Sequence, residues 1–397
     1  MSHENEQFLF NTEISTIINS KSPISFVNEQ TKYIKKRDYT LWKIVLSLLS
    51  IIIFIQFVMI ILLLKKKNQL TNKLLLKNIK ENIKEKSISN NSNHKNINKS
   101  LKVNKTEIYI SMSLDNNAIY PTLVSMTSAL ENNDNNKNIL VYHLLLSHDF
   151  NVNNLEIFES LKNHYELKIK YFYIPNIFSD MDKWRESDTI YYKLLIPFMF
   201  PEIKRMIFLD GDTLVFKDIS EMYKLPFNGN YVLGYPFHTP YIIDRLGINS
   251  KYYINGRVIL LNIPEIRKNH KDIELLKYTV DNHKKVLFLE QDTLNYVFYG
   301  KIGFLPLKYG IYLYGNYDEF KKSYMENLRV NLNMTELKNA IDDPSIVHFC
   351  CCNPKIWNKT TAHEKGFNHI CQRYQKQFYY YANKTDYYYD IYSKYMK

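Results

Sequence analysis

The chain has 397 residues, a formal net charge of +12 and 45% hydrophobic residues, which excludes a predominantly disordered protein and allows one large core or two ordinary ones. The positive charge does not indicate a nucleic-acid partner, because no zinc-finger, RNA-recognition or basic-zipper pattern accompanies it. Of the four cysteines, Cys350, Cys351 and Cys352 are adjacent and lack the spacing of zinc ligands. Cys371 can form a disulfide with one of these three in an oxidising compartment, but the sequence does not identify the partner.

The first predicted element is an uncharged apolar segment of 21 residues, 44 to 64, about 32 Å long as a helix against roughly 30 Å of hydrocarbon. We predict a cytosolic tail (1–43), a transmembrane anchor (44–64) and a Lys/Asn/Ser-rich stem (65–104). Basic residues flank both sides of the segment and orient it only weakly. Asn-x-Ser/Thr triplets, all C-terminal to the segment, favour a luminal body: Asn90, Asn98, Asn104, Asn333, Asn358 and Asn383. The expected localisation is a single-pass type II membrane protein of the Golgi or endoplasmic reticulum.

From Glu107 onward, short β-rich runs alternate with amphipathic stretches, the signature of successive βα units. The predicted strands are 108–114, 139–146, 167–174 and 206–209, and the predicted helices are 119–131, 153–163 and 188–199. This pattern predicts an α/β fold with a mainly parallel, Rossmann-like sheet and helices on both faces. No P-loop and no Gly-x-Gly-x-x-Gly motif appears, which excludes P-loop enzymes and dinucleotide oxidoreductases.

The strand 206–209 ends at Asp210, Gly211 and Asp212. Residues two apart on an extended strand face the same side, and Gly211 has no side chain to obstruct a phosphate. Carboxylate pairs of this kind suit Mg or Mn ions that are also bound by substrate phosphates. An Asp-x-Asp triplet is weak by itself, and an ordinary strand-to-turn junction is the alternative.

Further polar motifs lie in apolar surroundings along the chain. They are Ser111–Asn117, Tyr191–Leu195, Tyr253–Asn262, Glu290–Asn295, and Ile346–Phe349 followed by Lys355 and Trp357. Together and in this order, the motifs resemble those of the family 8 retaining glycosyltransferases, which include glycogenin and bacterial lipopolysaccharide galactosyl- and glucosyltransferases. The resemblance covers about residues 107–360.

The resemblance implies a nucleotide-diphospho-sugar transferase fold of the GT-A type, a catalytic domain at 105–362 and a Tyr/Lys-rich C-terminal extension at 363–397. It implies retaining transfer of a hexose, glucose or galactose, from a UDP-sugar to a glycan or glycoprotein acceptor. It also implies that Asp210, Asp212 and His348 ligate Mn, with Mg as the alternative ion. Without the resemblance, His348 is better explained as a buried core histidine.

For the nucleotide-sugar, the resemblance implies binding by Asp115, Asn117, Lys193 and Lys355 together with the Asp210–Asp212 segment. The alternatives are an Asx turn at Asp115 and Asn117 and a solvated helix lysine at Lys193. Lys193 stands where the family usually has Arg, so it keeps the charge but loses the bidentate fork.

At the reacting centre, the resemblance implies that Asn255 binds donor-sugar hydroxyls and that Gln291 and Asp292 orient the sugar at its reacting face. A strand-end cap or bulge at Asn255 and helix capping by Gln291 and Asp292 are the alternatives. The expected mechanism is front-face attack, in which positioning and electrostatics matter more than acid or base catalysis.

The sequence departs from the family pattern at three places. Arg257 stands where the family has Gly, Ala118 replaces an aromatic residue, and one extra residue between His348 and Trp357 puts the reach of Lys355 in doubt. These departures motivate a rival hypothesis, a non-catalytic glycan- or nucleotide-sugar-binding protein with the same fold. For the C-terminal extension we favour a solvated last helix over a segment that contacts acceptor or membrane.

Overall fold

The computed structural model describes residues 105–182, 187–237, 240–249, 253–312, 334–350, 352, 355–359 and 369–396. The chain divides into two compact units, 1–92 and 93–397, and every described residue lies in the second. The predicted tail, anchor and stem, residues 1–104, therefore lie outside the described residues.

The localisation predicted from the sequence requires correction. In the part of the chain that the structure describes, no helix has both the length and the apolar character needed to cross a bilayer. The longest of these helices, α14 (His369–Ala382), has 14 residues, about 21 Å against roughly 30 Å of hydrocarbon. We therefore withdraw the prediction of a type II membrane protein of the Golgi or endoplasmic reticulum.

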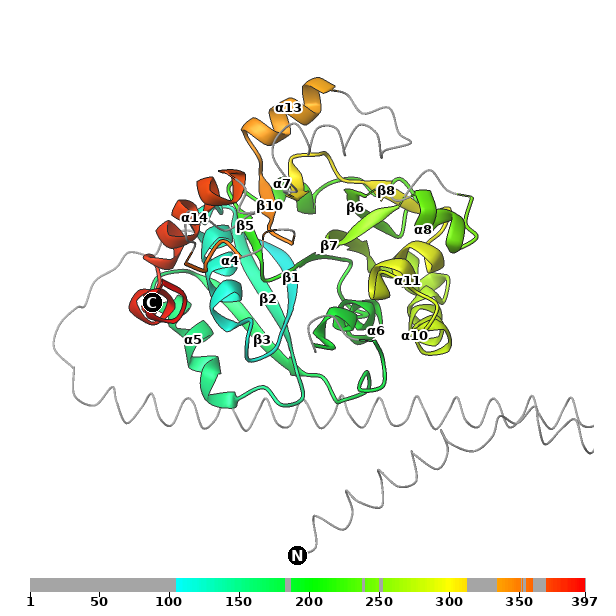
Figure 1. Cartoon of the computed structure of the whole chain (residues 1–397), viewed down its shortest axis with the longest axis horizontal. Helices are drawn as coiled ribbons and strands as arrows, with labels where there is room; N and C mark the ends of the chain where they lie inside the picture. The colour runs from blue at the N-terminus through cyan, green and yellow to red at the C-terminus, as the bar shows by residue number, and fades with distance from the viewer. Residues whose placement is uncertain are drawn as a thin grey trace, which may run out of the picture. The chain divides into compact units, whose positions relative to one another are not determined.

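The centre of the fold is a seven-stranded sheet with the order β3-β2-β1-β4-β7-β6-β8 (Figure 1). Its strands are β1 (Thr106–Leu114), β2 (Asn138–Leu146), β3 (Leu167–Tyr173), β4 (Arg205–Leu209), β6 (Val232–Pro236), β7 (Ile254–Asn262) and β8 (Ile302–Phe304). Every residue of β2 is buried, as expected for an inner strand covered on both faces. The predicted strands from 108 to 209 and the predicted helix 119–131 are present with small shifts of their ends, whereas the predicted helices 153–163 and 188–199 consist of short 3₁₀ and α-helical pieces.

The sheet is mainly parallel, as expected, because six of its seven strands run in one direction and only β7 is reversed. Strands β3, β2, β1 and β4 are parallel, but β7 runs antiparallel to both of its neighbours, β4 and β6. Because of this reversal, the beginning of β7 lies beside the end of β4, with Val258 paired to Leu209. Residues that precede or open β7 therefore meet the carboxyl edge of the parallel strands, where ligands bind in open α/β sheets.

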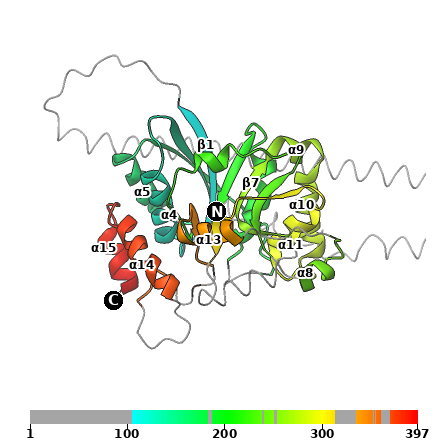
Figure 2. The same ribbon diagram turned by 90° about the horizontal axis from the view of Figure 1, so that it is seen from above.

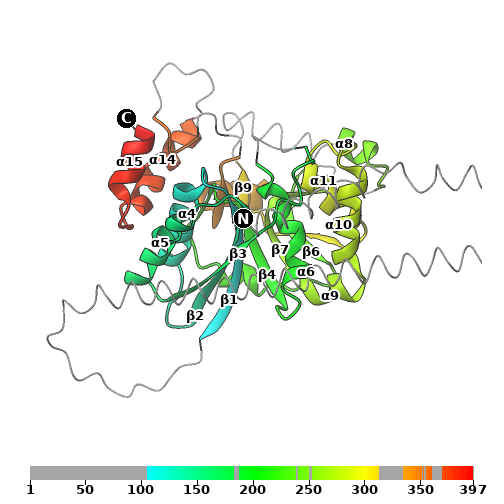
Figure 3. The same ribbon diagram turned by 90° about the horizontal axis from the view of Figure 1, so that it is seen from below.

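Helices gather on opposite sides of the sheet, as expected (Figures 2 and 3). On one side lie α4 (Ile119–Glu131), α5 (Leu155–Glu159), α14 and α15 (Tyr388–Met396), and on the other lie α9 (Ile263–Lys268), α10 (Lys271–Asn282) and α11 (Leu289–Val297). The remaining helical segments are η2 (Val152–Asn154), η3 (Ser160–Asn163), η4 (Thr189–Leu195), α6 (Ile196–Met199), α7 (Ser220–Tyr223), α8 (Pro240–Arg245) and α13 (Met334–Asp342).

A small second sheet brings residues 346–348, late in the chain, close to the end of β4. It has the order β5-β10-β9, formed by β5 (Thr213–Val215), β10 (Ile346–His348) and β9 (Tyr309–Tyr312). Strand β5 directly follows Asp212, and its antiparallel pairing with β10 sets His348 opposite Thr213. The backbone N–H of Phe349 donates to the carbonyl of Asp212 at 2.9 Å. This pairing brings the imidazole next to the two acids.

Candidate metal and nucleotide-sugar site

Asp210 and Asp212 stand at the carboxyl end of β4, as predicted, in a three-residue turn that leads into β5. Their side chains are partly buried, 15% and 18% exposed. The turn is held by Thr213, whose hydroxyl donates to the carbonyl of Asp210 at 2.8 Å. The two carboxylates are therefore fixed on a short segment but remain open to a ligand.

Gly211 is required for a reason that the sequence did not reveal. A Cβ at this position would lie 2.5 Å from the hydroxyl oxygen of Thr122 on α4. The absence of a side chain thus lets the turn pack against α4, whereas the sequence suggested only room for a phosphate.

His348 completes a group that can hold a metal ion. Its Nε2 lies 3.2 Å from Oδ1 of Asp212 and 3.9 Å from Oδ2 of Asp210, and one ligand atom from each residue lies within 4.8 Å of the others. Two carboxylate oxygens and one imidazole nitrogen form a donor set that suits Mn²⁺ or Mg²⁺. The predicted residues are brought together and fit the ion.

Lys355 reaches this group despite the extra residue in its spacing. Its ammonium lies 2.5 Å from Oδ2 of Asp212 and donates to the carbonyl of Phe349 at 2.8 Å. Burial favours the neutral carboxyl, but Lys355 and His348 outweigh it and hold the pKa of Asp212 well below its usual range. Asp212 is therefore a carboxylate at neutral pH.

The C-terminal extension holds the segment that carries Lys355. Gln375 on α14 donates to the carbonyls of Ile356 and Asn358, both at 2.9 Å, and the hydroxyl of Tyr379 donates to the carbonyl of Trp357. On α15, the carbonyl of Tyr395 accepts from the N–H of Lys359. Helix α14 of the extension is thus packed against the segment that carries Lys355, whereas α15, the last helix described, has Ile391 as its one buried residue and agrees with the favoured expectation of a solvated last helix.

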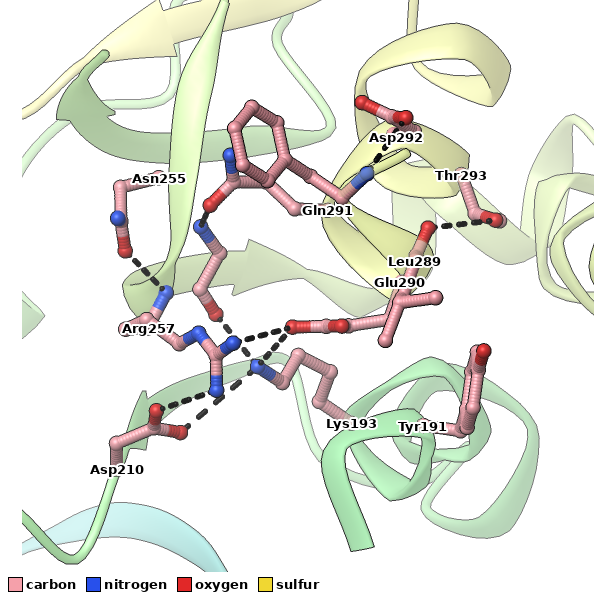
Figure 4. Close-up of polar contacts among 12 residues, drawn as sticks. Tyr191, Lys193, Asp210, Asn255, Arg257, Leu289, Glu290, Gln291, Asp292 and Thr293 are labelled. Carbon is pink, nitrogen blue, oxygen red and sulfur yellow. Dashed lines mark hydrogen bonds and ion pairs between the residues drawn. The ribbon is translucent and has the colours of Figure 1, made fainter. Parts of the chain in front are cut away.

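Lys193 is fully buried, which excludes the alternative of a solvated lysine. It lies on η4, and its ammonium donates to the carbonyl of Gly256 at 3.0 Å and to Oε1 of Glu290 at 3.1 Å (Figure 4). It also lies 3.8 Å from Oδ1 of Asp210. Lys193 thus joins the end of β4 to the start of α11.

Arg257 joins the same two places from β7, as Figure 4 shows. Its Nη1 donates to Oδ2 of Asp210 at 3.0 Å, and its Nη2 lies 3.6 Å from Oε1 of Glu290. The backbone is tied as well, because the N–H of Asp210 donates to the carbonyl of Arg257 at 3.0 Å. Although burial opposes the charged form, Glu290 and Asp210 raise the pKa of Arg257.

Glu290 was absent from the predicted site residues. Its side chain is 1% exposed, Oε1 is shared by Lys193 and Arg257, and Oε2 has no hydrogen-bond partner among the residues that the structure describes. The sequence carried only a weak signal: the start of α11 is polar, and a Glu there needs a cation only if it is buried. Its two partners lie 97 and 33 residues away and could not be identified from spacing.

Gln291 and Asp292 face the start of β7. Gln291 accepts from the N–H of Gly256 at 3.2 Å and donates to the hydroxyl of Tyr253 at 3.3 Å. Asp292 is fully buried and accepts from Tyr253 and from the N–H groups of Leu287 and Phe288. These contacts match the helix-capping alternative for Asp292, and a sugar-orienting role for both residues stays a prediction.

The side chains of Asn255 and Asp115 both accept hydrogen bonds from backbone N–H groups nearby in the chain. Asn255 accepts from the N–H of Arg257 at 2.9 Å, and Asp115 accepts from the N–H groups of Asn117 and Ala118. Asn117 is exposed. Because β1 and β4 are parallel neighbours, Asp115 follows its strand at the same edge as Asp210. The alternative of a local turn at Asp115 is present in the structure, and Asn255 lies at the start of β7 beside a register shift in the pairing with β6, which matches its alternative of a strand-end cap or bulge. The predicted ligand contacts of these residues stay predictions.

Cys352, between His348 and Lys355, is disulfide-bonded. The sequence left its partner open.

Known proteins resemble part of the chain. General stress protein A of Bacillus subtilis (strain 168) is 25% identical over 185 residues, covering 45% of this chain and 62% of that protein. Galactinol synthase 2 of Arabidopsis thaliana is 26% identical over 198 residues, covering 44% of this chain and 52% of that protein. The chain therefore spans between half and two thirds of these relatives.

A solved structure shares the fold. The crystal structure of the galactosyltransferase LgtC in complex with donor and acceptor sugar analogues matches with a TM-score of 0.58 and 17% identity, over 70% of this chain and 96% of that one. The family model described as glycosyl transferase family 8 matches residues 109–361, which include every predicted site residue. The mixed α/β architecture, the order of the motifs and this match agree, and the chain belongs to glycosyl transferase family 8.

Proposed function

We propose that this protein is a retaining glycosyltransferase that moves a hexose, glucose or galactose, from a UDP-sugar to a glycan or glycoprotein acceptor. One observation carries the proposal. Ligand atoms of Asp210, Asp212 and His348, which come from two distant parts of the chain, lie within 4.8 Å of one another at the carboxyl edge of the sheet. The family membership and the fold shared with a galactosyltransferase support it.

These three residues are the proposed ligands of Mn²⁺, with Mg²⁺ as the alternative. A divalent ion bound there would neutralise the negative charge that develops on the diphosphate as the sugar–phosphate bond breaks. His348 serves as a neutral ligand, because a metal ligand imidazole must be deprotonated at the bound nitrogen.

The charges around the site explain why a nucleotide-sugar would need a metal ion. Three cations, Lys193, Arg257 and Lys355, are matched by three carboxylates, Asp210, Asp212 and Glu290. The formal sum is zero, whereas a diphosphate with one charge on each phosphate brings about −2. A divalent cation restores the balance, so we expect diphosphate binding to depend on it.

In the proposed reaction, the acceptor oxygen bonds to the anomeric carbon on the face from which the phosphate departs. The bond between that carbon and the phosphate oxygen breaks, and the proton of the acceptor hydroxyl passes to the departing phosphate oxygen. Lys355, held beside Asp212, is the proposed stabiliser of that phosphate. Gln291 and Asn255, anchored on α11 and β7, are proposed to orient the sugar.

A donor screen tests the proposal. The full chain is incubated with Mn²⁺ and with each of several UDP-sugars, and released UDP is measured. We expect slow hydrolysis of UDP-glucose or UDP-galactose in water, lost in the matched variants Asp210→Asn and Asp212→Asn, which remove charge and keep size. UDP release that survives both variants would contradict the proposal.

A second candidate is a non-catalytic glycan- or nucleotide-sugar-binding protein. It is favoured by the guanidinium of Arg257, which engages Asp210 at 3.0 Å where the family has a glycine. It predicts no UDP release in the same screen, together with Mn-dependent UDP binding measured by calorimetry.

A further inference from the structure

We propose that Arg257 competes with the divalent ion for Asp210 and, once displaced, becomes a binding group for the diphosphate of the donor, so that it couples metal binding to nucleotide binding. This inference rests on the proposed metal site. It concerns a residue that departs from the family pattern, and it gives that departure a role.

The first step of the argument is the competition. The guanidinium of Arg257 engages Oδ2 of Asp210, the same carboxylate oxygen that lies 3.9 Å from Nε2 of His348 in the metal group. The guanidinium and a divalent ion both draw on the electron density of this carboxylate and repel each other as like charges, so each weakens the other's contact with Asp210. Metal binding at Asp210 must therefore weaken or break this contact.

The second step is that Arg257 does not leave the site when it is displaced. Its Nη2 lies 3.6 Å from Oε1 of Glu290, which is buried at the start of α11. Its backbone is fixed to Asn255 and to Asp210 by hydrogen bonds of 2.9 Å and 3.0 Å. The side chain of Arg257 therefore stays beside Glu290, while the N–H groups that contacted Asp210 become free to bind another partner.

The third step concerns what the released groups can bind. The side chain of Arg257 is 23% exposed, whereas those of Lys193 and Glu290 are 0% and 1% exposed. Of these three, Arg257 is the one open to a ligand. A guanidinium presents a rigid fork that matches phosphate oxygens, and a diphosphate held near Asp210 would lie within its reach.

This arrangement predicts opposite effects of removing the charge. Without Arg257, Asp210 meets less competition and the site loses one positive charge, so Mn²⁺ alone should bind more tightly. The diphosphate loses a partner, so UDP in the presence of saturating Mn²⁺ should bind more weakly. A residue with a merely structural role would weaken both.

The test measures Mn²⁺ binding to the full chain by electron paramagnetic resonance of the free ion, and UDP binding by calorimetry at saturating Mn²⁺. In Arg257→Gln, which keeps the length of the arm and removes its charge, we expect Mn²⁺ to bind about tenfold more tightly and UDP about tenfold more weakly. The control is Lys168→Gln on β3, which removes the same charge from an ammonium that is 54% exposed and pairs with Glu107. It should change neither affinity.

The outcomes separate this inference from the proposed function. If the wild-type chain binds no Mn²⁺, the proposed metal site and the inference both fail. If the wild type binds Mn²⁺ but Arg257→Gln binds it equally or more weakly, only the inference fails. Should Arg257→Gln not fold, Arg257→Lys replaces it: its arm keeps the charge but cannot engage both carboxylates, so Mn²⁺ should bind about threefold more tightly. An unchanged Mn²⁺ affinity in that variant overturns the inference.

Discussion

The ammonium of Lys355 lies 2.5 Å from a carboxylate oxygen of Asp212, which stands 143 residues earlier in the chain. The segment that carries Lys355 is held from behind by Gln375 and Tyr379 of α14, which donate to three consecutive carbonyls, those of residues 356 to 358. Helix α14 lies beyond the end of the family match at residue 361. A part of the chain outside the shared domain therefore positions a residue inside the site.

This relationship predicts that α14 affects UDP binding through Lys355. Gln375→Leu with Tyr379→Phe removes the hydrogen bonds to the carbonyls and should weaken Mn-dependent UDP binding about fivefold, because the ammonium loses its fixed position. Lys355→Ala should weaken it by tenfold or more.

A double-mutant cycle, measured by calorimetry, checks the path of this effect. If α14 acts through Lys355, the α14 changes should have little further effect in a chain that already carries Lys355→Ala. Fully additive losses would show that α14 acts on the site by another route.

Gly211 provides a steric test of the turn between the two acids. Gly211→Ala places a methyl group against the hydroxyl of Thr122, 2.5 Å away before any adjustment, and should destabilise the fold by about 1–3 kcal/mol. Thr122→Ala removes that hydroxyl, so the double variant should recover most of the loss. Urea unfolding gives the free energy of unfolding of the wild type, the two single variants and the double variant. A double variant as unstable as Gly211→Ala alone would mean that the strain arises elsewhere.

The buried pair of Lys193 and Glu290 predicts a large and non-additive effect on stability. Lys193→Met leaves Glu290 buried with Arg257 as its remaining charged partner and should cost about 3 kcal/mol of unfolding free energy. Adding Glu290→Gln removes the uncompensated charge, so the double variant should lose less than the sum of the two single variants. A loss in the double variant that lies within about 0.5 kcal/mol of the sum of the two single losses would indicate that the pair is not coupled.

His143 predicts a specific pH dependence of stability. The ring is buried on β2, stacked on Phe172 and edge-on to Phe200, and burial lowers its pKa to about 4, with Lys170 adding to the effect. The unfolded chain takes up this proton near pH 6.5, whereas the folded chain does so only near pH 4. Protonation of His143 therefore does not reduce the free energy of unfolding above pH 6.5. As the pH decreases from 6.5 to 4, uptake of the proton by the unfolded chain lowers the free energy of unfolding by about 3 kcal/mol.

His143→Leu should abolish that part of the pH dependence. The comparison is the unfolding free energy of wild type and variant between pH 4 and pH 7 in urea. Curves that stay parallel over this range would contradict a neutral buried imidazole.

The local sequence predicted the strands and helices of the first half because their apolar periodicity is strong and their partners are close in the chain. Asp210 and Asp212 were predictable for the same reason, since a buried strand that stops at two acids is visible in one short segment. His348 required a family pattern, because only the pairing of β10 with β5 brings it to Asp212.

Other features depend on tertiary structure that no single segment records. The reversal of β7 decides that Arg257 meets Asp210, and neither strand contains a signal for its direction relative to the other. Glu290 is explained only by two cations that come from η4 and β7. The Tyr-rich composition of the C-terminal extension suggested a solvated last helix, but it did not indicate the hydrogen bonds and packing to residues 356–358 that determine where α14 lies.

The most direct test of the account is calorimetry of UDP added to the full chain, with Mn²⁺ and then with a chelator. A metal group formed by Asp210, Asp212 and His348 predicts UDP binding that needs the ion and is lost in both Asp212→Asn and His348→Ala. UDP binding of equal strength with and without Mn²⁺, or unchanged in either variant, would contradict it.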